Sequence, residues 1–214
     1  MTIVCVASAG ASAFFEAMNA CVGIDFALLT DRDCEAERTA QRTGLRRERI
    51  PYPSAEEFSR RSSEWIEGMK DVGAVITLYD RLLTPPMIGR LPMLNIHPSL
   101  LPAFPGMGAL AAARAARVAH FGATLHGMTM RLDAGPIVAH VESHRESDEP
   151  LERMEKKSFV HKLYLILLAI DLLERGRLRF VHGLPVCDPG PRLENPRYRS
   201  HVEAIEKLEG VALS

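Results

Sequence analysis

The sequence predicts an α/β fold with a mostly parallel central sheet and helices on both faces. Short apolar runs alternate with amphipathic helical stretches from the N-terminus onward, which is typical of parallel strands joined by right-handed helical crossovers. The chain has 214 residues, of which 47% are hydrophobic and 25% charged, as in an ordinary soluble domain with one core. No internal repeat or linker interrupts this pattern, so we predict a single domain over residues 1–214.

The first half of the chain is expected to hold four strands and three helices. An apolar run at 3–7 leads into a small-residue turn, after which Phe14, Met18 and Cys21 recur at helical spacing. Ser54 precedes Glu57 by three residues, the pattern of a capping box that opens a helix. The expected strands are 3–7, 24–30, 49–52 and 74–78, and the expected helices begin near residue 12, span 34–43 and begin at 55.

The second half is expected to add further strands and one long helix. An Ala-rich stretch at 107–119 has high helix propensity, and Ser147 or Asp148 is placed to cap the long helix. Apolar residues then recur along one helical face from Phe159 to Leu173, which indicates core packing. The other expected strands are 93–97, 122–130, 136–143 and an edge strand at 177–181, with a short helix at 201–208 after the Pro/Gly-rich segment 184–197.

A chemically reactive set stands at the end of the fifth strand. Asn95 and His97 are two residues apart, so both side chains project from the same side of the strand. That edge is where open α/β sheets bind ligands. Asp133 lies in a Gly-Pro turn at 132–136 that is free to approach a cleft. An amide, an imidazole and a carboxylate are the groups needed to stabilise an oxyanion and to move a proton.

Each of these residues also has a purely structural interpretation. Asn95 could end a strand and Asp133 could form a turn. For His126 we favour a strand histidine satisfied by its neighbours, with a supporting role at the site as second choice. Five other histidines are expected to be surface or packing residues, namely His120, His140, His144, His161 and His201. The chemical interpretation therefore depends most on His97.

Three segments together resemble a known family. Asn-Ile-His-Pro-Ser-Leu-Leu-Pro at 95–102, Gly-Ala-Thr-Leu-His at 122–126 and Leu-Asp-Ala-Gly-Pro-Ile at 132–137 resemble the folate-dependent formyltransferases. Order and spacing agree from about residue 72 to 178 and are most similar to the branch that formylates glycinamide ribonucleotide in purine biosynthesis. The resemblance implies a Rossmann-like formyltransferase fold, one catalytic domain over residues 1–214, and one-carbon transfer from 10-formyltetrahydrofolate to an amine.

The resemblance also implies roles for the reactive set. In this family the formyl group passes through a tetrahedral intermediate. Asn95 would donate its amide to the formyl oxygen as negative charge develops there. His97 would support that oxyanion and help protonate the departing folate nitrogen. Asp133 would orient His97 and raise its basicity, or take the proton of the amine through a water molecule.

A folate site follows from the same resemblance. Arg81, Leu82 and Leu83 match the family segment that lines the pteridine pocket, largely through backbone groups; for Arg81 we weigh a solvent-exposed arginine at a helix start equally. A second segment matches the loop that closes over the pocket: Met128, Thr129, Met130, Arg131 and Leu132. No metal is expected, because the His and Cys residues show no ligand spacing.

The first turn departs from the family pattern. Glycinamide ribonucleotide enzymes read Ser-Gly-Asn-Gly-Ser-Asn where this chain reads Ser-Ala-Gly-Ala-Ser-Ala at 8–13, and the acidic residue that grips the ribotide corresponds to His182. We therefore expect a small-molecule amine other than glycinamide ribonucleotide as acceptor, with that ribonucleotide as the alternative. Backbone amides in the turn could still form an anion nest. The expected acceptor-binding residues are Gly10, Ala11, Ser12, Ala13 and His182.

Two other readings stay open, a formyltetrahydrofolate hydrolase and a catalytically silent folate-binding relative. A hydrolase is disfavoured because the first strand begins at Thr2, which leaves no place for the extra N-terminal regulatory domain of the family's hydrolases. Methionyl-tRNA formyltransferase is disfavoured because neither an additional C-terminal domain nor a basic surface is expected.

Composition limits the expected partners and location. The formal net charge is −1, so no nucleic-acid partner is implied. The four cysteines are scattered, which favours free thiols in a reducing compartment. No signal peptide is visible, and the longest apolar run, 163–170, is far shorter than the roughly 20 residues that a membrane span needs. We predict a cytoplasmic protein without membrane contact, either a monomer or a homodimer.

Overall fold

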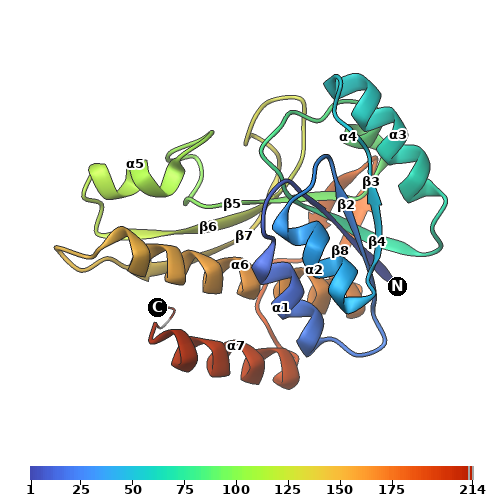
Figure 1. Ribbon diagram of the computed structural model, residues 1–214. Coiled ribbons are helices and arrows are strands. Elements are labelled where there is room, and N and C mark those ends of the chain that lie inside the picture. Colours follow the sequence, from blue (N-terminus) through green and yellow to red (C-terminus); the bar gives the residue numbers. More distant parts are fainter. Residues whose placement is uncertain (212, 214) are drawn as a thin grey trace.

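A seven-stranded sheet forms the centre of the fold (Figure 1). The computed structural model describes residues 1–211 and 213. Neighbouring strands follow the order β3-β2-β1-β4-β5-β6-β7, in which the first four pairs are parallel and the last two antiparallel. The expected mostly parallel sheet is therefore confirmed. The strands are β1 (Thr2–Ala7), β2 (Asp25–Thr30), β3 (Arg46–Arg49), β4 (Val72–Leu78), β5 (Met93–His97), β6 (His120–Gly127) and β7 (Ile137–His144).

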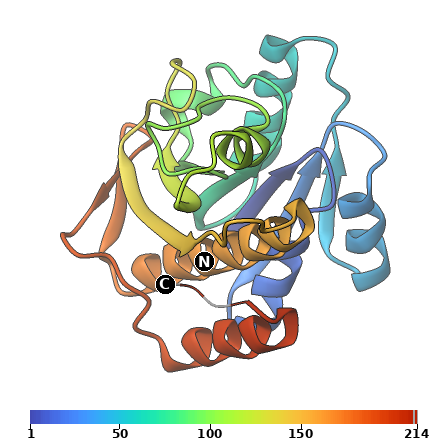
Figure 2. The same ribbon diagram turned by 90° about the vertical axis from the view of Figure 1, so that its left-hand side faces the viewer.

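Helices cover both faces of this sheet, as expected. In β1, Ile3 and Cys5 join a core with residues of α1 and α6, whereas Val4 and Val6 join a second core with residues of α3. Every residue of β1 is buried, and burial on both faces explains its continuous apolar sequence. Figure 2 shows α6 and α7 together on one side of the sheet. The helices are α1 (Ser12–Ala20), α2 (Glu35–Thr43), α3 (Ala55–Glu67), α4 (Met87–Arg90), α5 (Ala109–Ala115), α6 (Leu151–Glu174) and α7 (Pro196–Glu209).

None of the helices in the described part of the chain has the length and apolarity required to cross a lipid bilayer.

The two predicted helix caps have different outcomes. Ser54 Oγ accepts a hydrogen bond of 3.2 Å from the Glu57 N–H, so the cap before α3 is confirmed. The prediction that Ser147 or Asp148 caps α6 is wrong, because Pro150 is the N-cap residue and no side chain caps this helix. A proline disfavours the helical conformation of the residue before it, so α6 cannot begin earlier.

Two strand assignments also differ from the structure. The third strand is Arg46–Arg49 rather than 49–52. Its charged side chains are all exposed and backbone pairing with β2 holds it at the sheet edge, so no apolar pattern marks it. The edge strand expected at 177–181 is β8 (Leu178–Val181), which pairs with β9 (Leu184–Cys187) in a separate two-stranded sheet. The sequence does not indicate β9 because it contains Pro185, a residue type that is rare inside strands.

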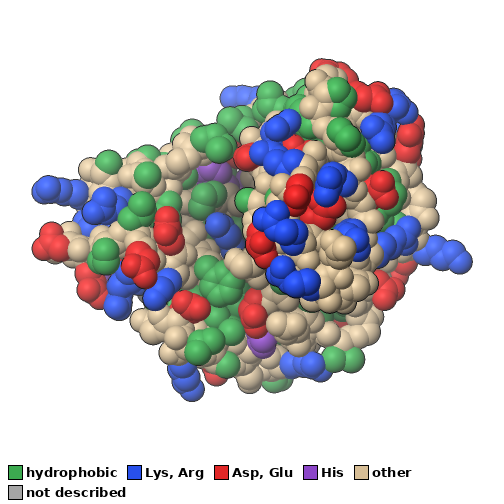
Figure 3. Space-filling model, in the orientation of Figure 1, with side chains coloured by type: hydrophobic (Ala, Val, Ile, Leu, Met, Phe, Trp, Pro, Cys, Tyr) green, Lys and Arg blue, Asp and Glu red, His purple; other side chains and the backbone are tan. Residues whose placement is uncertain are grey.

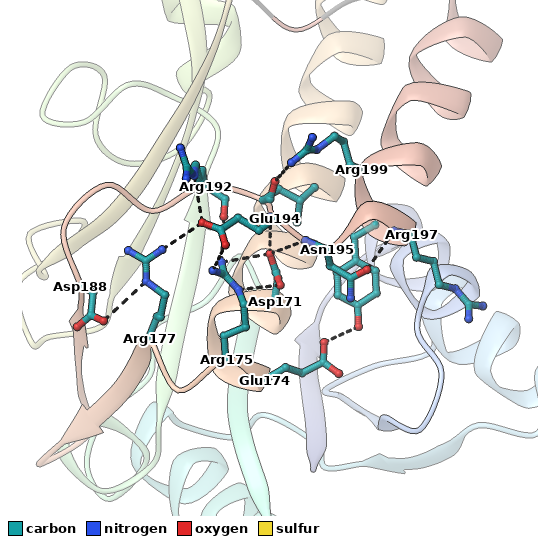
Figure 4. Close-up of polar contacts among 12 residues, drawn as sticks. Asp171, Glu174, Arg175, Arg177, Asp188, Arg192, Glu194, Asn195, Arg197 and Arg199 are labelled. Atoms are coloured by element: carbon teal, nitrogen blue, oxygen red, sulfur yellow. Dashed lines mark hydrogen bonds and ion pairs between the residues drawn. The ribbon is translucent and has the colours of Figure 1, made fainter.

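A buried carboxylate fastens the C-terminal segment to α6 (Figure 4). Asp171 is 2% exposed and accepts hydrogen bonds from Arg175 Nε at 3.0 Å and from the backbone N–H groups of Glu194 at 2.7 Å and Asn195 at 3.2 Å. Asn195 in turn accepts a hydrogen bond of 3.0 Å from the Arg197 N–H. This cap lets α7 begin before residue 201, where the sequence predicts its start.

His161 is buried in the interior, and its environment makes stability depend on pH. Its Nε2 lies 2.8 Å from Ser143 Oγ, and its ring meets Phe121 edge-on. Burial lowers the pKa of His161 from its ordinary value near 6.5 to about 3, and the charges of Lys157 and Lys162 act in the same direction. The ring is therefore neutral in the folded protein, whereas the unfolded chain takes up a proton below pH 6.5.

We expect His161 to lower the free energy of unfolding on acidification, by roughly 1.4 kcal/mol for each pH unit below its unfolded pKa. His161→Gln keeps a polar partner for Ser143 but does not titrate, so the variant should lose this part of the pH dependence. Urea unfolding of both proteins between about pH 7 and about pH 4.5 measures the difference. Parallel pH profiles would show that His161 is not responsible.

Candidate active site

Strand β5 carries two of the predicted residues to the C-terminal end of the parallel part of the sheet. Asn95 pairs with Thr77 of the parallel strand β4 on one side and with His126 of the antiparallel strand β6 on the other. His97 ends β5 and is 5% exposed. The two side chains therefore lie on the same side of β5, as their spacing predicts.

Asp133 reaches this strand end from the loop between β6 and β7. Its Oδ2 lies 3.4 Å from His97 Nδ1 and accepts a hydrogen bond of 2.7 Å from the Gly106 N–H, while its Oδ1 lies 3.8 Å from His126 Nε2. A Cβ at Gly135 would overlap the carbonyl oxygen of Gly127, so this glycine lets the Asp133 turn pack directly on the end of β6. The structure thus brings the three predicted catalytic residues into one cluster.

The imidazole of His97 is held between two acceptors. Its Nε2 donates a hydrogen bond of 2.8 Å to the carbonyl oxygen of Phe104, and its Nδ1 faces the Asp133 carboxylate. Phe104 adopts a left-handed conformation with φ of 50°, which turns its carbonyl toward the ring. When both ring nitrogens carry protons, each has an acceptor in place.

His126 is a fourth member of the cluster. Its Nδ1 lies 2.8 Å from the Gly127 carbonyl oxygen and its Nε2 lies 3.1 Å from Asn95 Nδ2. A carbonyl only accepts, so Nδ1 carries the proton and Nε2 accepts from the Asn95 amide. Burial lowers the pKa of His126, which keeps the ring neutral. The interpretation as a histidine satisfied by its neighbours is incomplete; its place directly opposite Asn95 is visible only once β5 and β6 are known to be paired.

Thr124 explains another part of the Gly-Ala-Thr-Leu-His motif. It faces His97 across β5 and β6. Its Oγ1 donates a hydrogen bond of 2.6 Å to the Ser99 carbonyl and accepts one of 3.0 Å from the Leu101 N–H. This hydroxyl fixes the loop that leaves β5, and with it the direction in which His97 enters the cleft.

The predicted folate segments present apolar side chains at the surface. Leu82 is 65% exposed, Met130 63% and Leu132 65%, whereas Leu83 is buried. Figure 3 shows a hollow that contains histidine and hydrophobic side chains, between the part that carries α5 and the part that carries α2 and α3.

The other residues of the predicted folate segments form ion pairs, ring contacts or hydrogen bonds within the chain. Arg81 is exposed, as in the alternative interpretation, and its guanidinium pairs with Asp31 at 3.1 Å and lies over the ring of Tyr52 at 4.8 Å. Met128 Sδ lies 3.5 Å from Thr77 Oγ1. Thr129 Oγ1 donates to the Arg131 carbonyl at 3.0 Å and accepts from the Arg131 N–H at 3.3 Å, which shapes the loop.

The predicted acceptor residues lie in two separate segments, and no hydrogen bond or ion pair joins His182 to residues 10–13 in the described part of the chain. At the first turn, Ala11 has a φ of 50° and no side chain caps the N-terminus of α1. His182 is exposed at the turn between β8 and β9, with Gly183 packed beside Gly89 and Leu91. Its predicted role at the acceptor stays a prediction.

Among the described residues, no group of three or more His, Cys, Asp or Glu side chains is arranged to hold a metal ion.

A family model described as Formyl transferase matches residues 2–168. This chain belongs to the formyl transferase family. The resemblance seen in the sequence is thereby confirmed, together with the Rossmann-like fold.

Individual formyl transferases match over different lengths. Phosphoribosylglycinamide formyltransferase of Bacillus subtilis is 42% identical over 71 residues, which cover 33% of this chain and 35% of that protein. The Haemophilus influenzae enzyme of the same name is 30% identical over 116 residues, 53% of this chain and 55% of that protein. The crystal structure of glycinamide ribonucleotide transformylase 1 from Symbiobacterium toebii superposes with a TM-score of 0.78 at 27% identity, covering 88% of this chain and 94% of that one. The matched segments thus span about a third to a half of the two curated relatives.

These relatives overturn the expectation of an acceptor other than glycinamide ribonucleotide, because both curated enzymes and the solved structure bear names that specify this acceptor. The expectation rested on side chains lost from the first turn. A site built from backbone N–H groups does not need those side chains, and the N-terminus of α1 keeps its N–H groups uncapped. Other curated relatives are formyltetrahydrofolate deformylases and methionyl-tRNA formyltransferases.

We expect Asn95→Ala to lower kcat for formyl transfer by on the order of 100-fold or more, because loss of one oxyanion donor typically has this effect. Release of tetrahydrofolate from 10-formyltetrahydrofolate measures the rate. Asn19→Ala, at an exposed position of α1, is the matched control and should keep the wild-type kcat. An Asn95→Ala enzyme of unchanged kcat would remove this residue from the chemistry.

Proposed function

We propose that this chain transfers the formyl group of 10-formyltetrahydrofolate to the amine of glycinamide ribonucleotide, a step of purine biosynthesis. The observation that carries the proposal is the cluster of Asn95, His97 and Asp133 at the C-terminal end of β5, in a chain of the formyl transferase family. The names of its relatives support the choice of acceptor.

Asn95 supplies the hydrogen bond to the formyl oxygen. Its Nδ2 carries two N–H groups, and one of them is directed at His126. The other has no partner among the described residues and is left for the substrate. Its hydrogen bond stabilises the negative charge that develops on the formyl oxygen when the amine attacks the formyl carbon.

His97 and Asp133 move the protons. The attacking amine must lose a proton, and the folate nitrogen must gain one as its bond to the formyl carbon breaks. Asp133 Oδ2 and His97 Nδ1 are 3.4 Å apart, close enough for the pair to take the proton of the amine and deliver one to the departing nitrogen.

The donor binds against the apolar rim of the cleft. A pterin is flat and largely aromatic, and its polar edge needs paired backbone donors and acceptors. The exposed side chains of Leu82, Met130 and Leu132 supply the apolar part. The Tyr52 hydroxyl donates to the Leu82 carbonyl at 2.8 Å, which steadies the backbone of the segment that would meet the pterin edge.

The acceptor phosphate binds at the start of α1. Four N–H groups at a helix N-terminus lack intrahelical partners and attract anions. Here no side chain occupies them, and Ala11 takes the left-handed conformation that turns successive N–H groups to one side. The segment from Gly10 to Ala13 can therefore hold a phosphate through its backbone.

A second candidate, hydrolysis of 10-formyltetrahydrofolate, is favoured by one observation. The formyltetrahydrofolate deformylase of Escherichia coli is among the curated relatives, and the same three residues could direct water instead of an amine at the formyl carbon. Formate would then appear without any acceptor.

We also propose that the enzyme works in the cytoplasm on small molecules. Cys5, Cys21, Cys34 and Cys187 are all free thiols, which suits a reducing compartment.

We expect purified protein to formylate glycinamide ribonucleotide with a kcat/KM of about 10⁴ M⁻¹s⁻¹ or higher, as ordinary enzymes do with their own substrates. Tetrahydrofolate and formate are measured in parallel, with and without the ribonucleotide. Tetrahydrofolate that appears only with the acceptor supports the transferase. Formate release at the same rate without acceptor would support the hydrolase, and absence of both activities would contradict the proposal.

A further inference from the structure

We propose that Thr77 is a positioning residue that sets which end of the Asn95 amide faces the reacting formyl group. The inference rests on the proposed function, because it deepens the role of Asn95. Thr77 belongs to none of the three segments that resemble the formyltransferases, and it touches no reacting atom. It acts through the Asn95 side chain.

The hydroxyl of Thr77 donates a hydrogen bond to the oxygen of the Asn95 amide. Thr77 is 1% exposed on β4 and stands beside Asn95 in the parallel pairing of β4 and β5. Its Oγ1 donates to Asn95 Oδ1 at 2.8 Å, with the Leu94 carbonyl as a longer second acceptor at 3.2 Å. A hydroxyl has one proton, and the shorter contact is the one to the amide.

On the opposite strand, His126 accepts a hydrogen bond from the nitrogen of the Asn95 amide. Its Nδ1 proton is committed to the Gly127 carbonyl, so Nε2 is an acceptor and requires an N–H of Asn95 at 3.1 Å. The hydrogen bonds from the two neighbouring strands therefore favour the same orientation of the Asn95 amide, with its oxygen toward β4 and its nitrogen toward β6. This orientation leaves the second N–H of Asn95 as a donor for the formyl oxygen.

Loss of the Thr77 hydroxyl removes one of the two hydrogen bonds that orient the Asn95 amide. The Asn95 oxygen would lose its hydrogen bond beside the buried position 77, and the amide would turn away from its productive angle in part of the molecules. Oxyanion donors are effective because they are already oriented before the reaction. The expected cost is therefore in kcat, by about tenfold for one hydrogen bond, with little change in the KM of either substrate.

A merely structural role for Thr77 makes a different prediction. Thr77→Val keeps the branched shape and removes the hydroxyl, whereas Thr77→Ser keeps the hydroxyl and leaves a small cavity in a buried strand. If Thr77 only fills space, the serine variant is the more impaired one. If Thr77 positions Asn95, the serine variant keeps kcat within about twofold while the valine variant loses it.

The test measures kcat, both KM values and thermal stability for the wild type, Thr77→Val and Thr77→Ser. Thr30→Val is the matched control, since Thr30 is a fully buried threonine at the end of β2 whose Oγ1 has no hydrogen-bond partner among the described residues. Thr77→Val in an Asn95→Ala background should add no further loss of kcat. Equal kcat in Thr77→Val and wild type, or an equal loss with and without Asn95, would overturn the proposal.

The same proteins separate this inference from the proposed function. If the wild type releases formate instead of transferring the formyl group, the proposed function fails and the variants are compared by formate release. If the wild type has neither activity, NMR signals of the Asn95 side-chain amide test whether Thr77 positions this amide. Two distinct amide proton signals should persist in Thr77→Ser and shift or merge in Thr77→Val; unchanged signals in Thr77→Val would refute the positioning role.

Discussion

The carboxylate of Asp133 joins segments that the chain order keeps apart. One oxygen accepts the N–H of Gly106, in the loop after β5, and faces His97, while the other faces His126 near the end of β6. Its side chain is 6% exposed, so the charge has exchanged water for these fixed partners. Any change that moves the loop between β6 and β7 therefore moves the whole reactive cluster. The position of β5, between a parallel and an antiparallel neighbour, gives Asn95 a different partner on each side.

Two residues with a left-handed backbone conformation belong to the same cluster. Of the six non-glycine residues with positive φ in the described part of the chain, Ala11 begins the first turn, Phe104 presents its carbonyl to His97, and Asp133 is the carboxylate itself. A left-handed conformation costs roughly 1–2 kcal/mol for a residue with a Cβ. Such residues persist where the surrounding structure over-determines them, and they gather at functional sites. Here Phe104 and Asp133, two of the six, each place a polar atom against His97.

Local patterns in the sequence predict what depends on neighbours in the chain. The i, i+2 spacing of Asn95 and His97 determines their common side, and the Ser54 cap follows from one side chain and one N–H three residues on. Contacts between strands lie beyond such patterns. His126 becomes a partner of Asn95 only through the antiparallel register of β5 and β6, and β3 is held by backbone pairing that its charged sequence does not reveal.

Prediction of the acceptor from the sequence has the same limitation, because it compares side chains and not backbone conformation. Side-chain comparison of the first turn reads the missing asparagine as a missing phosphate site. In the site that we propose, the phosphate is recognised mainly through N–H groups, which every residue except proline supplies in the right conformation. Ala11 adopts a conformation that suits glycine and disfavours alanine. The conformation of this turn is therefore a better guide to anion binding than its side-chain composition.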